Sequence, residues 1–209
     1  MFVFPGGNFH VVIACMAIGY HSYLMKTTHL RAMLMLFFAA FASPAMADQN
    51  DPQLIPLFEK LKTAPDYEAA REIEFYIWHI WSKANTAGGG LLFRQGVQYM
   101  NDGEHEKALV NFNALVEIEP EFAEGWNKRA TLYYLMGNYD RSVADIQRTL
   151  ALEEHHFGAL SGLGMIYDAL DRKEAALKAF RAALEIHPNM ETIRRRAEEL
   201  VEETEGTPL

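Results

Sequence analysis

The chain has 209 residues, half of them apolar, which is enough to bury a core and suggests one domain or two. Its formal net charge of -9 argues against a nucleic-acid-binding protein, which needs a basic face to neutralise phosphates, and disfavours acidic partners. The single cysteine, Cys15, excludes a disulfide framework and a cysteine-based metal site.

The N-terminal region has the order of a secretory signal peptide, which we place at residues 25–47. Lys26 and Arg31 precede an apolar run at residues 32–42, and an Ala-Met-Ala cleavage sequence follows. The alternative, a membrane anchor, is disfavoured because this run is far shorter than the ~20 residues that cross a bilayer. We expect cleavage after Ala47 and release into the periplasm, with no stable membrane insertion afterwards.

Residues 1–24 have no usable basic region, and Met25 could itself begin an ordinary signal peptide. We therefore expect residues 1–24 to be a misassigned upstream extension. Cleavage would remove Lys26 and Arg31 but no acidic residue, which lowers the charge from -9 to -11.

Residues 48–88 are predicted to form two helices and a linker. Pro65 ends the first helix, and Asp66 is a candidate cap for the second. Each helix has an apolar face, made by Leu54, Leu57, Phe58 and Leu61 in the first and by Ile73, Ile77, Trp78, Ile80 and Trp81 in the second. We expect this pair to be a degenerate repeat that caps the stack described next, joined to it by Asn-Thr-Ala-Gly-Gly-Gly.

A 34-residue period begins at Gly89, and three segments align without a gap: residues 89–122, 123–156 and 157–190. Position eight is always small, position eleven is always tyrosine, position twenty is small and position twenty-four is large. In that order the residues are Gly96, Ala130 and Gly164; Tyr99, Tyr133 and Tyr167; Ala108, Ser142 and Ala176; Phe112, Ile146 and Phe180. Position thirty-two holds Pro120, Glu154 and Pro188.

Each unit reads as two helices joined by a turn that contains Gly103, Gly137 or Asp171, residues that tolerate a left-handed backbone. Small residues at positions eight and twenty let the two helix axes approach within ~8–10 Å. The pattern resembles the tetratricopeptide repeat. The resemblance implies an all-α fold: a right-handed superhelical stack of antiparallel helix pairs, with an N-terminal helical pair and a C-terminal capping helix. Residues 191–209 are expected to supply that cap and a tail, with Ile193, Ala197, Leu200 and Val201 facing inward.

No catalytic, cofactor or metal site is predicted. His155 and His156 are adjacent in an inter-repeat turn, where a solvated loop is expected, and His79 is expected to be partly buried. The glycines at 88–90 lack the following Lys-Ser or Lys-Thr of a phosphate loop, so a linker is expected there. Trp126 and Tyr133 occupy scaffold positions and are expected to pack rather than to react.

The resemblance implies a concave groove lined by the first helix of each repeat, where such proteins bind extended peptides or helices. The corresponding positions are Phe93, Arg94, Val97, Met100, Asn101, Asn127, Lys128, Thr131, Tyr134, Leu135, Ser161, Met165 and Asp168. The subtype that grips acidic C-terminal tails needs basic residues and asparagine where this chain has Phe93, Val97, Gly158 and Gly162. We therefore expect a hydrophobic or amphipathic partner segment.

Three functional hypotheses follow. The first is a non-enzymatic exported scaffold or adaptor that binds an envelope protein through the groove. The second is a self-associating structural protein of the envelope. The third, a small hydrolase or transferase, has no nucleophile and base at a recognisable spacing in its favour.

Overall fold

The computed structural model describes residues 48–205. The predicted signal peptide, its cleavage site and the tail at 206–209 lie outside the described residues. Residues 48–205 form nine α-helices and one short 3-10 helix, with no strand. Their bounds are η1 Asp48–Asn50, α2 Leu54–Lys62, α3 Tyr67–Trp81, α4 Ala87–Asn101, α5 His105–Ile118, α6 Ala123–Leu135, α7 Tyr139–Leu152, α8 Phe157–Ala169, α9 Lys173–Ile186 and α10 Glu191–Glu205. None of these helices is long and apolar enough to span a membrane.

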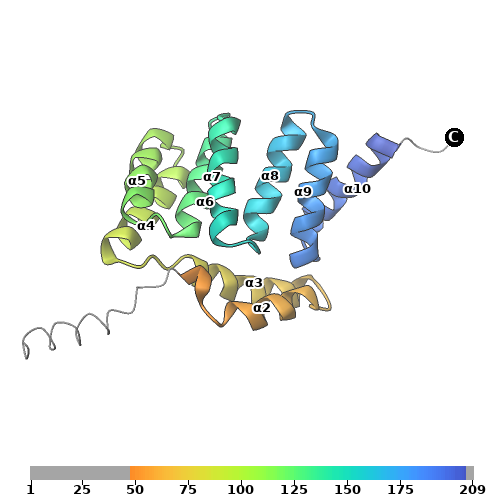
Figure 1. Ribbon diagram of the computed structural model, residues 1–209, viewed down its shortest axis with the longest axis horizontal. Coiled ribbons are helices and arrows are strands. Elements are labelled where there is room, and N and C mark those ends of the chain that lie inside the picture. The colour runs from red at the N-terminus through yellow and green to blue at the C-terminus, as the bar shows by residue number, and fades with distance from the viewer. Residues whose placement is uncertain (1–47, 206–209) are drawn as a thin grey trace, which may run out of the picture. The chain divides into compact units, whose positions relative to one another are not determined.

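Three helix pairs, α4–α5, α6–α7 and α8–α9, stand side by side in the order of the chain (Figure 1). Each pair turns at a residue with a left-handed backbone, Gly103, Gly137 or Asp171, whose φ angles are 74°, 71° and 55°. The predicted turns are thus confirmed, and the abrupt end of each first helix brings the second one back against it.

The small residues of the repeat lie where the paired helices touch. A Cβ atom on Gly96 would come within 2.6 Å of the Phe112 ring, and one on Gly164 would overlap the Phe180 ring. In the middle pair, the buried Ser142 hydroxyl donates a 2.7 Å hydrogen bond to the carbonyl oxygen of Ala130. This bond satisfies the one polar side chain at a position where the other repeats have alanine.

The predicted glycine linker is instead the first turn of α4. Thr86 caps this helix by accepting a hydrogen bond from the Gly89 amide, and the buried Glu119 carboxylate accepts hydrogen bonds from the amides of Asn85 and Thr86. A side chain on Gly89 would overlap Glu119. Glycine here therefore allows the carboxylate to approach the helix N-terminus, where its charge is favourable.

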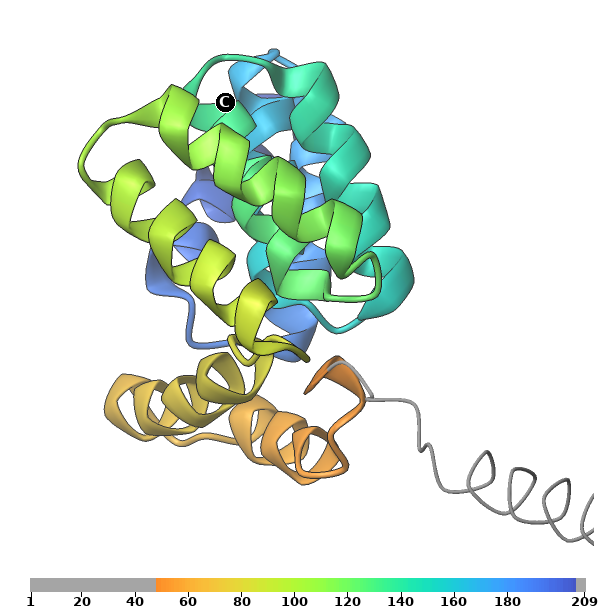
Figure 2. The same ribbon diagram turned by 90° about the vertical axis from the view of Figure 1, so that its left-hand side faces the viewer.

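Helices α2 and α3 form the predicted pair, and Asp66 caps α3 by accepting a 2.9 Å hydrogen bond from the Ala69 amide. Their packing differs from the expected terminal repeat. The pair lies across the ends of the repeat helices, against the start of α8 and the end of α9, rather than extending the stack (Figures 1 and 2).

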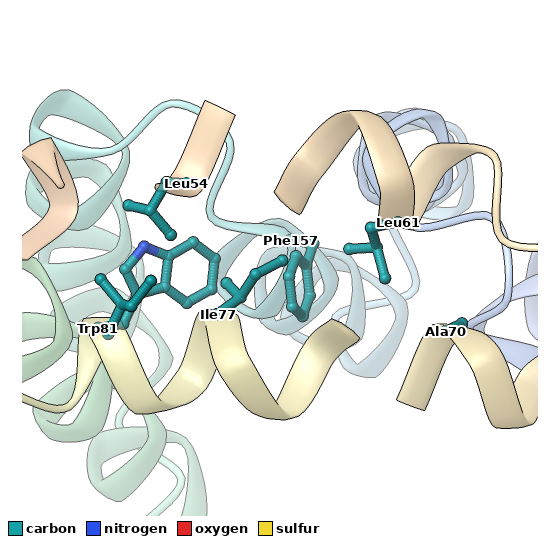
Figure 3. Close-up of a cluster of buried hydrophobic side chains, with 7 residues drawn as sticks. Leu54, Leu61, Ala70, Ile77, Trp81 and Phe157 are labelled. Atoms are coloured by element: carbon teal, nitrogen blue, oxygen red, sulfur yellow. The ribbon is translucent and has the colours of Figure 1, made fainter. Parts of the chain in front are cut away.

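The seam between this pair and the repeats is a hydrophobic cluster. Leu54 and Leu61 of α2, and Ile77 and Trp81 of α3, surround Phe157 at the start of α8 (Figure 3). At the other end of the seam, Asn189 donates a 3.1 Å hydrogen bond to the Ala64 carbonyl.

Helix α10 covers α9 as predicted, with Ala197 and Leu200 buried and Ile193 and Val201 packed beside them. Arg196 ties it to α8 through two hydrogen bonds to Asp168, of 2.7 and 2.8 Å.

Candidate functional site

A pocket of about 280 Å³ lies between α6 and α8, with α7 as its floor. Its lining consists of Asn127, Ala130, Thr131, Tyr134, Leu135, Ser142, Ile146, Gly158, Ser161, Gly162, Met165 and Ile166. No lining residue is charged, and the apolar side chains are interspersed with one amide, four hydroxyl groups and two glycines. The pocket therefore favours a largely apolar occupant with a few hydrogen-bonding groups.

Two glycines on α8 line this pocket, and one of them, Gly162, keeps it open. A Cβ atom on Gly162 would meet only the Ile146 Cδ1 atom, at an ordinary 3.7 Å, so the space beside it is free of other atoms. Gly158 serves another purpose, since a Cβ atom there would approach the Trp78 ring of α3 to 2.8 Å. The α2–α3 pair thus packs against the same end of α8 that borders the pocket.

A second pocket, of about 430 Å³, adjoins the first and shares Tyr134 and Met165 with it. Its other walls include Asp168 of α8 and Thr192, Arg195, Arg196 and Glu199 of α10. We call the two pockets together the α6–α8–α10 groove. One end of this groove is uncharged, and the other is lined by ionic side chains.

The Asp168 carboxylate already accepts two hydrogen bonds from Arg196. Its hydrogen bonds with Arg196 hold the pKa of its carboxyl group below the usual value, and burial opposes that shift only in part. The pKa of Arg196 is raised by the same bonds and by further bonds to Glu203 and Glu199. Asp168 therefore holds α10 against α8. Its negative charge at the edge of the groove is neutralised by Arg196.

A fully buried carboxylate, Glu124, lies beside the uncharged end of the groove. Its oxygens lie 3.1 Å from the Lys128 Nζ atom, 2.8 Å from the Asn127 side-chain Nδ2 atom and 3.1 Å from the His156 Nε2 atom. Burial raises the pKa of Glu124, but attraction to Lys128 and bonds from His156 and Asn127 outweigh it, so the pKa lies below its usual value. This network fixes the orientation of Asn127 at the groove wall.

The expectation of a solvated loop at His155 and His156 is wrong for His156. Its ring is completely buried and stacks on Trp81, with centroids 4.1 Å apart. Its Nδ1 atom accepts a hydrogen bond from the Ala159 amide and so caps α8, which leaves the proton on Nε2, facing Glu124. His155 is exposed and stacks on Phe58, whereas His79 is exposed rather than partly buried.

Seven of the thirteen predicted groove residues line the two pockets of the α6–α8–α10 groove. Six of them line the uncharged pocket: Asn127, Thr131, Tyr134, Leu135, Ser161 and Met165. Asp168 lines the adjoining one. Lys128 pairs with Glu124 and lies over the Trp78 ring.

The residues from the first repeat behave differently. Phe93 is a core residue, 7% exposed and packed edge-on against Phe122, so its placement in a groove is wrong. Arg94, Val97, Met100 and Asn101 line neither pocket of the groove.

The sequence did not predict that Ser142 and Ile146 form the floor of the pocket, or that Gly158 and Gly162 line it. The glycines were visible as missing side chains at two groove positions of the third repeat. Among residues 48–205, no three histidine, aspartate or glutamate side chains gather in a metal-binding arrangement.

Comparison with known proteins places the fold in a family. The family model for the tetratricopeptide repeat matches residues 157–190. A TPR repeat-containing protein of Rhizobium etli is 33% identical over 154 residues, which cover 74% of this chain and 76% of that protein. The chain belongs to the tetratricopeptide repeat family.

Solved structures agree on the fold. The first TPR domain of Spaghetti (RPAP3), bound to an HSP90 peptide, has a TM-score of 0.54 at 20% identity, covering 56% of this chain and 94% of that domain. The crystal structure of MamA has a TM-score of 0.53 at 19% identity, covering 71% of this chain and 84% of that chain. Proteins of this family typically bind proteins or peptides and are typically not enzymes.

Proposed function

We propose that this protein is an exported, non-enzymatic adaptor that holds a hydrophobic or amphipathic segment of an envelope protein in the α6–α8–α10 groove. The observation that carries the proposal is the uncharged pocket between α6 and α8, which six predicted groove residues line. Its size suits one or two apolar side chains, and Asn127, Thr131 and Ser161 can bond to a partner backbone.

The partner segment continues toward α10 in this proposal. Asp168 is neutralised by Arg196, while Arg195 has no carboxylate within ion-pair distance in the described part of the chain. An apolar side chain would enter between Tyr134 and Met165, and polar groups at the other end of the segment would meet Arg195. This arrangement suits an amphipathic segment better than a uniformly apolar one.

Capture of partners from a periplasmic fraction tests the groove. Gly162→Leu places a side chain in the pocket, where the glycine Cβ position is free, and should abolish capture of the partner. Gly162→Ala adds one methyl group and should retain capture, as should Val110→Ala on the exposed face of α5. Retention of every partner by Gly162→Leu, with melting unchanged, would refute the groove assignment.

Export is tested separately. The N-terminus of the protein recovered from the periplasm should be Asp48, as determined by mass spectrometry of the intact chain. Recovery only from the cytoplasm, or with residues 25–47 attached, would contradict export by a cleaved signal.

A further inference from the structure

A third pocket, of about 280 Å³, lies on the surface of the α2–α3 pair, apart from the groove. Its lining consists of Gln53, Pro56, Leu57, Lys60, Tyr76, His79, Ile80 and Lys83. We call it the α2–α3 pocket. None of these residues lines the α6–α8–α10 groove, so an occupant would leave that groove free.

The α2–α3 pocket has an apolar floor and an aromatic wall. Leu57 and Ile80 belong to the core beneath it, whereas Tyr76 is half exposed. Phe75, which is 66% exposed, lies edge-on to Tyr76 with centroids 5.7 Å apart and is stacked on His79. Exposed aromatic side chains grouped beside a pocket are typical of protein interaction sites.

The charges at this pocket are all of one sign. Lys60 and Lys83 line it, and no aspartate or glutamate does. Within residues 48–205, neither lysine has a carboxylate within ion-pair distance, so both ammonium groups are available to an anionic ligand. The net charge of -9 disfavours acidic partners as a whole, but an ion pair depends on the charges within a few ångströms.

We propose that the α2–α3 pocket binds an acidic segment of a partner protein, with an apolar side chain inserted against Tyr76 and flanking carboxylates facing Lys60 and Lys83. An anionic membrane surface fits less well, because residues 51–84 carry six acidic and only four basic side chains, and a broad anionic surface would meet them all. With the groove, this pocket gives the adaptor a second, independent attachment point.

The test uses the full chain and two probe peptides: acetyl-Glu-Leu-Phe-Glu-amide and its counterpart with lysine in place of both glutamates. In an NMR titration, the acidic peptide should shift the amide signals of residues 57–60 and 76–83, and the basic peptide should not. Lys60→Glu with Lys83→Glu should weaken binding of the acidic peptide about fivefold, the effect of two surface ion pairs. Lys62→Glu, which reverses one charge in the last turn of α2 outside the pocket, should leave binding unchanged.

Three results would overturn the proposal. The first is equal binding of both peptides, and the second is equal loss in the Lys62 control. The third is an occupant of another kind: co-sedimentation with phosphatidylglycerol vesicles that the double variant abolishes, or a concentration-dependent dimer that it dissociates. The groove variant Gly162→Leu should bind the acidic peptide normally, so failure of the groove proposal is distinguishable from failure of this one.

Discussion

Substituting alanine for two glycines on one helix should change stability in opposite directions. Gly162 and Gly164 are both interior residues of α8, so alanine at either position gains about 0.5–1 kcal/mol from the lower entropy of the unfolded chain and better helix propensity. At position 162 the new methyl group meets one atom, at 3.7 Å, and nothing opposes that gain. At position 164 it would overlap the Phe180 ring, and such overpacking costs about 1–3 kcal/mol.

The expected result is a free energy of unfolding raised by about 0.5–1 kcal/mol in Gly162→Ala and lowered by up to about 2.5 kcal/mol in Gly164→Ala. Urea denaturation followed by circular dichroism at 222 nm measures both, with the wild type as reference. The variants share composition, helix and propensity, so only the surroundings of the methyl group differ. Changes of the same sign would refute the placement of Gly164 at the helix contact and of Gly162 beside an open pocket.

Three further predictions concern the core and the buried charges. Ala176→Leu should lower the free energy of unfolding by about 1–3 kcal/mol, because Ala176 is fully buried where α9 meets α8, and an unchanged melting temperature would count against the repeat alignment. Glu124→Ala should cost about 3–5 kcal/mol in a thermal melt because it leaves Lys128 and His156 without their carboxylate, and a loss below 1 kcal/mol would mean the network is not formed. The folded-state pKa values of Glu124 and Asp168 lie below the ordinary values of 4.5 and 3.8, so stability should be complete above about pH 4.5 and fall as the pH drops through the folded-state values. Urea midpoints measured from pH 7 down to pH 3 check this, and a midpoint that rises on acidification would contradict it.

The repeat architecture could be predicted because the period and the small residues report local contacts. Gly96 and Gly164 face the large residue sixteen positions later in their own repeats, and the left-handed turns follow each first helix directly. Every one of these contacts lies within a single 34-residue unit. Alignment of the units was therefore enough to place them.

The packing of the α2–α3 pair could not be predicted in the same way. Its two apolar faces were identified correctly, but a face does not specify its partner. That partner includes Phe157 and His156, about eighty residues further along the chain. The same long-range contact explains the buried His156, because Trp78 and Trp81 of α3 cover a turn residue that would otherwise be solvated.

The candidate site also contains residues that the repeat pattern predicts and residues that it does not. Thr131, Tyr134 and Met165 were found because repeat positions specify which residues face the groove, whereas Phe93 was misplaced because Phe122 covers it. The openness of the pocket depends on the absence of a side chain at Gly162. The α2–α3 pocket had no signal in the repeat pattern, because Lys60 and Lys83 come together only when the two helices pair.

Site-specific photo-crosslinking in intact cells tests the proposed groove most directly. A photoreactive residue at Thr131, on the pocket wall, should yield one discrete crosslinked protein by mass spectrometry, while the same residue at Val110, exposed on α5, should yield none. No product at Thr131, or the same products from both positions, would contradict binding in the α6–α8–α10 groove.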